Sequence, residues 1–301
     1  MKSIRKALRV GVRHKSIFEI CVGLVLFIFA CLFIGSLRSR SQRQKESFQP
    51  DQLITVALYE NSTAPTRTQN LTKLLEKFGY NYVILGGGEK WNGWYGRMKT
   101  CLTYLNTLDD EKYILFSDGR DVLVGEDATT FSERAIQLYN EKGGKIIFNG
   151  ETLCCVAGKE FKGTQEEKET YFEEIRKFFE GIQPEPAPPL YTLNYGLAFG
   201  KVRDFKKMFY IMDLKPEEDD QGVLIQKIMN GEFANYALDY ENSLFGIMFD
   251  KPPEWDPVKK QFSNPTTKSF PAFLHFPGKS PDYDNCAKVL LQEYLHDSPI
   301  L

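Results

Sequence analysis

The sequence predicts an α/β fold, in which a mostly parallel central sheet is flanked by helices and preceded by one transmembrane helix. Two observations predict the sheet. Apolar runs typical of strands alternate with helical patterns between residues 53 and 151, and each connection is long enough for a crossover. A third observation predicts the membrane helix, because residues 20–37 form an 18-residue stretch without a charged side chain.

The first half of the chain has a regular order of elements. Runs rich in branched apolar residues predict strands at 53–60, 81–88, 113–118 and 145–151. Apolar residues at helical spacing predict helices at 66–80, 96–108 and 129–143. Strands in this order run parallel with right-handed crossovers, and such a sheet binds ligands beyond the carboxyl ends of its strands.

The second half is more mixed. The proline-rich residues 181–190 predict a surface loop rather than a domain boundary, and a helix is expected at about 203–212. Further segments at 191–201, 217–229 and 236–249 lead to a loop-rich tail, and no internal repeat appears. We therefore expect one domain from residue 51 to residue 301.

Lysine and arginine are concentrated around the uncharged stretch. Residues 1–45 carry ten Lys/Arg and a single acid, and six of these bases precede the stretch, which predicts a cytosolic N-terminus. A cleaved signal peptide would be shorter and would end in an Ala-x-Ala-like site, which is not evident here. The expected order is a cytosolic basic tail (1–16), a transmembrane signal anchor (17–37), a stem (38–50) and a lumenal domain (51–301). The anchor would hold the protein in the Golgi or endoplasmic reticulum membrane.

The chain after residue 45 is acidic. Of the 38 basic and 40 acidic residues of the whole chain, it keeps 28 and 39, a net charge of about −11. An acidic domain argues against nucleic acid as a partner, because phosphate binding needs a basic face. The charge fits a metal-dependent site better.

Two further features agree with a secretory lumen. Glycosylation sequons begin at Asn61 and Asn70, as in a glycoprotein. The four cysteines of the domain do not have the spacing of a zinc site: Cys101, Cys154, Cys155 and Cys286. An oxidising lumen suggests one disulfide between the 154/155 pair and Cys286, and buried free thiols are the alternative.

A run of polar residues, Ser-Asp-Gly-Arg-Asp, follows the third predicted strand directly. Asp118 and Asp121 would both project at the ligand edge of the sheet, where two close carboxylates repel unless a cation lies between them. Carboxylate oxygens suit Mn²⁺ or Mg²⁺, with diphosphate oxygens completing the shell. The alternative is an acidic turn, because Asp and Gly favour turns.

A second polar site follows an apolar segment near the end of the domain. His275 precedes Gly278 and Lys279. A neutral imidazole could be the third metal ligand, and the Gly-Lys pair could approach a diphosphate with a backbone N–H and an ammonium. The alternative is a structural histidine beside a surface lysine.

Eight segments resemble, in the same order, the glycosyltransferase domain of the procollagen lysyl hydroxylases and related collagen-type glycosyltransferases of GT-A fold. The resemblance covers most of residues 52–280. The segments are LITVALYE, LGGGEKWNG, GRMKTCLTYL, ILFSDGRDVLV, YTLNYGLAFGK, EEDDQGVLIQKI, YALDYENSLFGIM and FLHFPGK. Each motif is modest, but eight in one order are specific.

The resemblance implies transfer of a hexose, glucose or galactose, from a UDP-sugar to a hydroxyl of a protein or glycan acceptor. Asp118, Asp121 and His275 would hold the metal. The diphosphate would be contacted by Lys99, Gly278 and Lys279, and the uridine pocket would be lined by Val56, Ala57, Tyr59, Gly119 and Arg120. Trp91 would form the wall of the donor site, and Asn194 would bind the donor sugar. Asp219 or Asp220 would face the sugar, as a base or as a stabiliser of positive charge.

The chain departs from the family pattern at two places. Gly119-Arg120 stands where the family has Ser-Tyr, whose Tyr packs on uracil, so either Arg120 covers the base or the stacking comes from elsewhere. Asn194-Tyr195-Gly196 replaces Asn-Ser-Gly, which affects the sugar or acceptor pocket. No hydroxylase domain is evident, so collagen is not implied as the acceptor. Two alternatives stay open: a catalytically inactive GT-A-fold binding or scaffold protein, and a glycogenin-like retaining glycosyltransferase with a different acceptor.

Overall fold

The computed structural model describes residues 53–60, 65–152, 163–182, 190, 192–248, 251–278, 280 and 282–295. The predicted tail, anchor and stem lie outside these residues, so the membrane topology and the Golgi or endoplasmic reticulum location stay predictions. Among the helices that the structure describes, none combines the length and the apolar character that crossing a bilayer requires.

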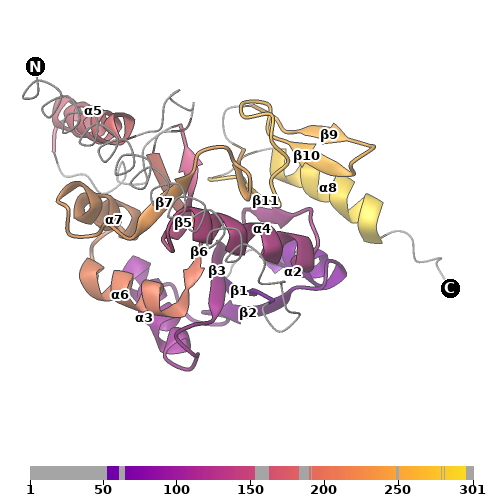
Figure 1. Ribbon diagram of the computed structural model, residues 1–301, viewed down its shortest axis with the longest axis horizontal. Helices are drawn as coiled ribbons and strands as arrows, with labels where there is room; N and C mark the ends of the chain where they lie inside the picture. The colour runs from indigo at the N-terminus through magenta and orange to yellow at the C-terminus, as the bar shows by residue number, and fades with distance from the viewer. Residues whose placement is uncertain are drawn as a thin grey trace, which may run out of the picture. The chain divides into compact units, whose positions relative to one another are not determined.

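A six-stranded sheet forms the centre of the fold (Figure 1). Its strands are β1 (Thr55–Tyr59), β2 (Asn81–Leu85), β3 (Tyr113–Asp118), β5 (Ile146–Glu151), β6 (Thr192–Lys201) and β7 (Tyr236–Asp239), in the order β2-β1-β3-β6-β5-β7. Strand β6 is antiparallel to both of its neighbours, and every other pairing in this sheet is parallel. The predicted mostly parallel sheet is confirmed.

Helices cover both faces of this sheet, because its strands are apolar on both sides. Alternate residues along β1 face opposite cores: Val56 and Leu58 face one, and Ala57 faces the other. The first core includes helices α2 (Pro65–Lys77), α4 (Ala128–Glu141) and α8 (Asp282–Leu295). The second includes α3 (Gly93–Leu105), α5 (Gln165–Gly181), α6 (Val202–Met212) and α7 (Asp220–Met229), and Figure 1 shows the two groups on opposite sides.

A second, three-stranded sheet brings two distant polar segments together. It has the order β4-β11-β8, with β4 at Val122–Val124, β11 at Phe273–His275 and β8 at Phe245–Ile247. His275 pairs with Val122, and the Phe276 N–H donates to the Asp121 carbonyl at 2.7 Å. The antiparallel register of β4 and β11 therefore fixes His275 beside the loop that follows β3. A hairpin, β9 (Glu254–Asp256) and β10 (Gln261–Ser263), completes the strands of the described chain.

Two helices of the second half were not predicted from the sequence. Helix α5 begins with a capping box between Thr164 and Glu167, and its polar surface hides a buried stripe that includes Ile175 and Phe179. Helix α8 occupies the end of the chain, where only loops were expected, and buries Tyr283 and Leu290. Helix α5 buries only two residues, so its apolar stripe is narrow, whereas α8 buries four: Tyr283, Cys286, Ala287 and Leu290.

The predictions about cysteines and sequons are tested in part. Cys286 is a buried free thiol, so the suggested disulfide to residue 154 or 155 is not formed; those two residues lie outside the described part. Burial raises the pKa of Cys101 and of Cys286 to about 12, which keeps both thiols protonated. Asn70 lies within helix α2 and is half-buried beside Tyr283, an unfavourable setting for a glycan.

Candidate functional site

A cavity of about 780 Å³ opens at the carboxyl ends of β1 and β3. This is the edge at which a parallel sheet is expected to bind ligands. The cavity is lined by Tyr59, Glu60, Arg67, Trp91, Trp94, Arg97, Asp118, Gly119, Arg120, Asp121, Asn194, Tyr195, Gly196, Asp220, Gln221, His275, Pro277 and Gly278.

Strand β6 enters this cavity through a bulge. Phe148 of β5 pairs with Ala198, but the next residue, Asn149, pairs with Asn194, so residues 195–197 of β6 lie opposite a single step of β5. A bulge re-aims side chains and often lies next to a functional site. Here it places Asn194, Tyr195 and Gly196 on the cavity wall from within the sheet.

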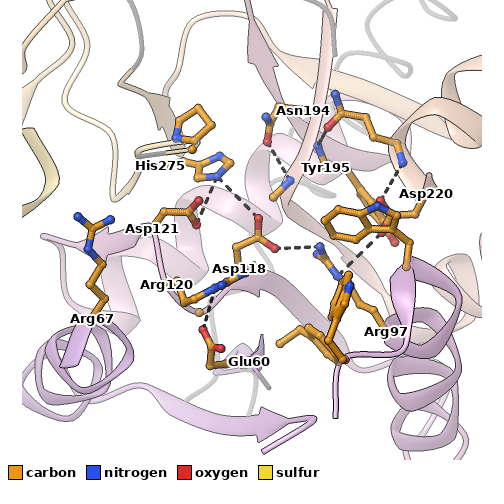
Figure 2. A pocket seen from close by; sticks show the side chains of 18 residues that line it. Glu60, Arg67, Arg97, Asp118, Arg120, Asp121, Asn194, Tyr195, Asp220 and His275 are labelled. Atoms are coloured by element: carbon orange, nitrogen blue, oxygen red, sulfur yellow. Dashed lines mark hydrogen bonds and ion pairs between the residues drawn. The ribbon is translucent and has the colours of Figure 1, made fainter. Parts of the chain in front are cut away.

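Asp118, Asp121 and His275 converge on one point of the cavity (Figure 2). One ligand atom of each lies within 4.8 Å of the others. His275 Nε2 is 3.8 Å from Asp118 Oδ2 and 3.7 Å from Asp121 Oδ1. These distances are too long for hydrogen bonds, and burial lowers the pKa of His275 to about 4, which keeps the imidazole neutral. The three groups therefore surround a gap and do not pair with one another.

This gap fits a divalent metal ion. Asp121 Oδ1 is buried and has no hydrogen-bond partner among the described residues. Burial and the neighbouring Asp118 raise the pKa of Asp121 above its usual range, which is the strain expected of two carboxylates without a cation. Gly196 keeps the space open, because a Cβ there would overlap His275 Cε1 and lie 2.9 Å from Asp118 Oδ2. Two carboxylates and a neutral imidazole are ligands that Mn²⁺ accepts.

Arg97 of helix α3 links the triad to the far wall of the cavity. Its Nη1 is 2.9 Å from Asp118 Oδ1, and its Nε is 4.0 Å from Asp220 Oδ2. Three rings surround the guanidinium carbon at 5.5–5.7 Å: Tyr59, Trp94 and Tyr195. Burial alone would lower the pKa of Arg97, but Asp118 and Asp220 outweigh it and raise that pKa. Arg97 is therefore a fixed buried cation beside the proposed ligands.

A network of side chains fixes the polar groups on this wall. Glu151, at the end of β5, accepts hydrogen bonds from Asn194 Nδ2 at 3.1 Å and Gln221 Nε2 at 3.2 Å. The amide oxygens face backbone donors: Gly196 N–H donates to Asn194 at 2.8 Å and Tyr195 N–H to Gln221 at 2.9 Å. Both amides are thereby held in one orientation. Beside them, burial raises the pKa of Asp220 to about 7.

The opposite end of the cavity carries charged side chains. Arg120 Nε lies 3.3 Å from Glu60 Oε2, and Glu60 is nearly buried. Arg67, on helix α2, stacks at 4.4 Å over the Tyr283 ring and pairs with Asp284 at 2.9 Å. In Figure 2 these groups lie on the other side of the triad from Asp220. The cavity therefore has a charged end and an end of aromatic rings and amides.

The structure brings most of the predicted site residues to the cavity. Those that line it are Tyr59, Trp91, Asp118, Gly119, Arg120, Asp121, Asn194, Asp220, His275 and Gly278. Gly119 is required by close approach, because a Cβ there would lie 2.8 Å from Glu60 Cβ. Lys279 lies outside the described residues, so its expected diphosphate contact stays a prediction.

Four predicted residues do not line the cavity. Val56 and Ala57 are fully buried within β1, and only the end of that strand reaches the site. Lys99 is exposed on the outer side of α3, with its Nζ 5.4 Å from the Tyr95 ring centre. Asp219 is the N-cap of α7 and accepts from Gly222 N–H at 2.7 Å, which leaves Asp220 to face the cavity.

The sequence analysis also missed several lining residues, among them Arg67, Trp94, Arg97 and Gln221. For Arg97 a signal was present. Residues 97, 101 and 105 are four apart and form the buried stripe of α3, whereas Lys99 lies on the opposite side of the helix. Arg67 carried no comparable signal, because its position depends on α8, which was not predicted.

No protein-family model matches the sequence. The chain is 28% identical over 173 residues to a multifunctional procollagen lysine hydroxylase and glycosyltransferase of Caenorhabditis elegans, a match that covers 53% of this chain and 21% of that protein. The chain thus spans about a fifth of the length of this curated relative.

Two solved structures with 13% sequence identity are similar to the chain. One is a glycosyltransferase involved in the glycosylation of the major capsid of PBCV-1, with a TM-score of 0.43, over 78% of this chain and 98% of that one. The other is the galactosyltransferase LgtC in complex with donor and acceptor sugar analogs, with a TM-score of 0.40, over 80% and 96%.

Proposed function

We propose that the chain is a metal-dependent glycosyltransferase that moves a hexose from a UDP-sugar to an acceptor hydroxyl. The observation that carries the proposal is the gap between Asp118, Asp121 and His275, kept open by Gly196 and set at the ligand edge of the sheet. The curated relative, whose name includes glycosyltransferase, supports the same reaction class. Mn²⁺ or Mg²⁺ is the expected ion, and glucose or galactose the expected hexose.

Different residues of the cavity have different proposed roles. A divalent ion held by the triad would neutralise the negative charge of the departing diphosphate. Arg97 adds a second, permanent positive charge 2.9 Å from Asp118. Arg120 and Glu60, at the charged end, lie where the nucleoside would extend from the diphosphate. Asn194 and Gln221, oriented by Glu151, face the opposite end and can bind sugar hydroxyls.

The transfer balances as a substitution at the anomeric carbon. The bond between that carbon and the diphosphate oxygen breaks, and its electron pair leaves with UDP. A bond from the acceptor oxygen to the anomeric carbon forms, and the acceptor hydroxyl releases its proton. Asp220, with a pKa of about 7, is suited to accept this proton or to stabilise positive charge on the sugar ring.

UDP release by the full-length protein tests this proposal. We expect release from one of a panel of UDP-sugars with Mn²⁺, none with EDTA, and loss of release in Asp121→Ala. Asp110→Ala is the matched control, because Asp110 pairs with Lys206 on the surface, away from the cavity. A protein that binds UDP with Mn²⁺ but never releases it from a sugar would favour the inactive binding protein. Absence of both binding and release would contradict the proposal.

A further inference from the structure

We infer that the acceptor is a neutral carbohydrate, whose terminal sugar stacks on Trp91 at the rim of the cavity. This inference rests on the proposed function and adds the class of acceptor to it.

Trp91 is a large apolar side chain held at the surface. It is 43% exposed, yet its ring is fixed edge-on by Trp94 at 5.0 Å and by Tyr59 at 6.1 Å between centroids. A rigid indole that stays open to solvent beside a cavity offers a flat apolar face. The C–H face of a hexose ring matches such a surface, because one side of the ring carries apolar hydrogens and its edge carries the hydroxyls.

The polar groups that can bind a sugar lie deeper. Asn194, Asp220 and Gln221 are only 4–6% exposed. A sugar that is still attached to a diphosphate at the triad would reach this buried floor first. The acceptor must then approach from the open side, where Trp91 forms the rim. The donor sugar would therefore bind at the buried polar residues, and the acceptor would bind at the exposed indole of Trp91.

The indoles adjoin the reacting region as well as the rim. The Trp94 ring centre is 5.7 Å from the guanidinium carbon of Arg97, whose Nε is 4.0 Å from Asp220. A Cβ at Gly93 would lie 3.2 Å from the carbonyl oxygen of Pro216, so the start of α3 packs against the segment that leads into α7. A sugar on Trp91 would thus present its hydroxyls towards the floor of the cavity.

The charges of the cavity favour a neutral acceptor. Three of its four lining carboxylates pair with arginines, Glu60 with Arg120 and both Asp118 and Asp220 with Arg97, and the fourth, Asp121, belongs to the proposed metal site. An amino-bearing acceptor, such as a hydroxylysine side chain, would bring an ammonium group without a carboxylate to receive it. A hydroxyl-rich neutral ring avoids this cost.

Acceptor kinetics on the full-length protein test the inference, with Mn²⁺ and the best UDP-sugar. We expect transfer to aryl glycosides with a terminal hexose and little transfer to a hydroxylysine peptide. Trp91→Ala should raise the KM for the glycoside by about tenfold or more, the loss of one stacked ring, with Trp91→Phe intermediate. A fall in Mn²⁺-dependent UDP binding of Trp91→Ala, with the KM for the glycoside unchanged, would instead place the indole at the donor-site wall and contradict the acceptor role. Trp255→Phe is the matched control, because Trp255 packs on Phe262 in the β9–β10 hairpin, outside the cavity.

The outcomes distinguish a wrong acceptor class from a wrong proposed function. If wild type transfers only to the hydroxylysine peptide, the carbohydrate acceptor is wrong. If Trp91→Ala leaves the glycoside KM unchanged, the stacking on Trp91 is wrong. In both cases the glycosyltransferase stands. If wild type neither binds UDP with Mn²⁺ nor releases it from any UDP-sugar, the proposed function is wrong, and the proposed acceptor class is then wrong as well.

Discussion

Gly196 faces His275 across the proposed metal position, and no larger residue fits between them. A Cβ at residue 196 would overlap His275 Cε1 and would lie 2.7 Å from Nε2. Real Cβ atoms do not approach this closely, and His275 is itself buried, so it cannot swing away without disturbing β11. The backbone of β6 is therefore one wall of the ligand set.

The first prediction follows from this contact. Gly196→Ala should abolish Mn²⁺ binding by displacing His275 or Asp118, while the protein stays folded. Calorimetric titration with Mn²⁺ measures the loss, and thermal unfolding checks the fold. Gly181→Ala is the matched control, because a Cβ there meets nothing within 4 Å at the end of α5. Unchanged Mn²⁺ affinity in Gly196→Ala would remove the triad as the binding site.

A second prediction concerns the buried cation. Arg97→Met should lower the free energy of unfolding by about 3–5 kcal/mol, because it leaves Asp118 and Asp220 facing a buried apolar side chain. Urea denaturation measures the change. The control is Arg203→Met, whose partner Glu111 is exposed, so that its loss should change the free energy of unfolding much less than Arg97→Met does. Equal costs for the two variants would contradict the structural role assigned to Arg97.

The third prediction is a pH profile for transfer. Burial raises the pKa of Asp220 to about 7, and a base acts in its deprotonated form, so kcat should rise as the pH increases through about 7. Asp220→Asn should lower kcat about 100-fold or more and remove this rise, with UDP binding retained. A variant that keeps the wild-type profile would show that another group carries the proton.

A fourth prediction concerns stability against pH. Asp127 caps α4 by accepting from the N–H groups of Thr129 and Thr130. Its partial burial opposes ionisation, but these hydrogen bonds prevail and hold the pKa of Asp127 below its usual 3.8. The stabilisation is therefore full above the unfolded pKa and is lost as the pH falls through the lower folded value. Asp127→Ala should cost about 1 kcal/mol at pH 7 and less at pH 3, by urea denaturation.

Asp127→Asn separates the contribution of the Asp127 charge to stability from that of the capping hydrogen bonds. Asparagine keeps an acceptor for the two N–H groups but does not titrate, so its difference from wild type should be small at pH 7 and should vanish in acid. A constant difference between Asp127→Ala and wild type from pH 7 to pH 3 would show that the Asp127 charge contributes nothing.

The central sheet could be predicted because its strands are buried on both faces. A strand such as β3 reads as an uninterrupted apolar run, and the polar residues that follow it mark the ligand edge. Its partners could not all be predicted. An apolar run has the same composition in either direction, so the reversed β6 and its bulge depend on the neighbours β3 and β5.

Part of the candidate site could likewise be predicted from the sequence, and part of it could not. Asp118 and Asp121 could be found because they follow the apolar run of β3 at the ligand edge of the central sheet, and His275 because it ends a second apolar segment, β11. The resemblance pointed to Lys99, whereas the four-residue spacing of residues 97, 101 and 105 puts Arg97 on the buried stripe of the same helix and Lys99 on the opposite side. Asp219 and Asp220 differ by one position at the start of α7, where the first residue caps and the second enters the cavity.

The bulged strand has a consequence for how such a site can vary among related chains. Asn194 and Gly196 belong to β6, which lies inside the central sheet and pairs with both β3 and β5, so a substitution there can affect the sheet as well as ligand binding. Trp91 belongs to an exposed connection between β2 and α3 and carries no such burden. The residues that contact the metal and the donor should therefore change slowly among related chains, while the residues at the acceptor rim change faster. Related chains with the same metal and donor site can then transfer sugars to different acceptors.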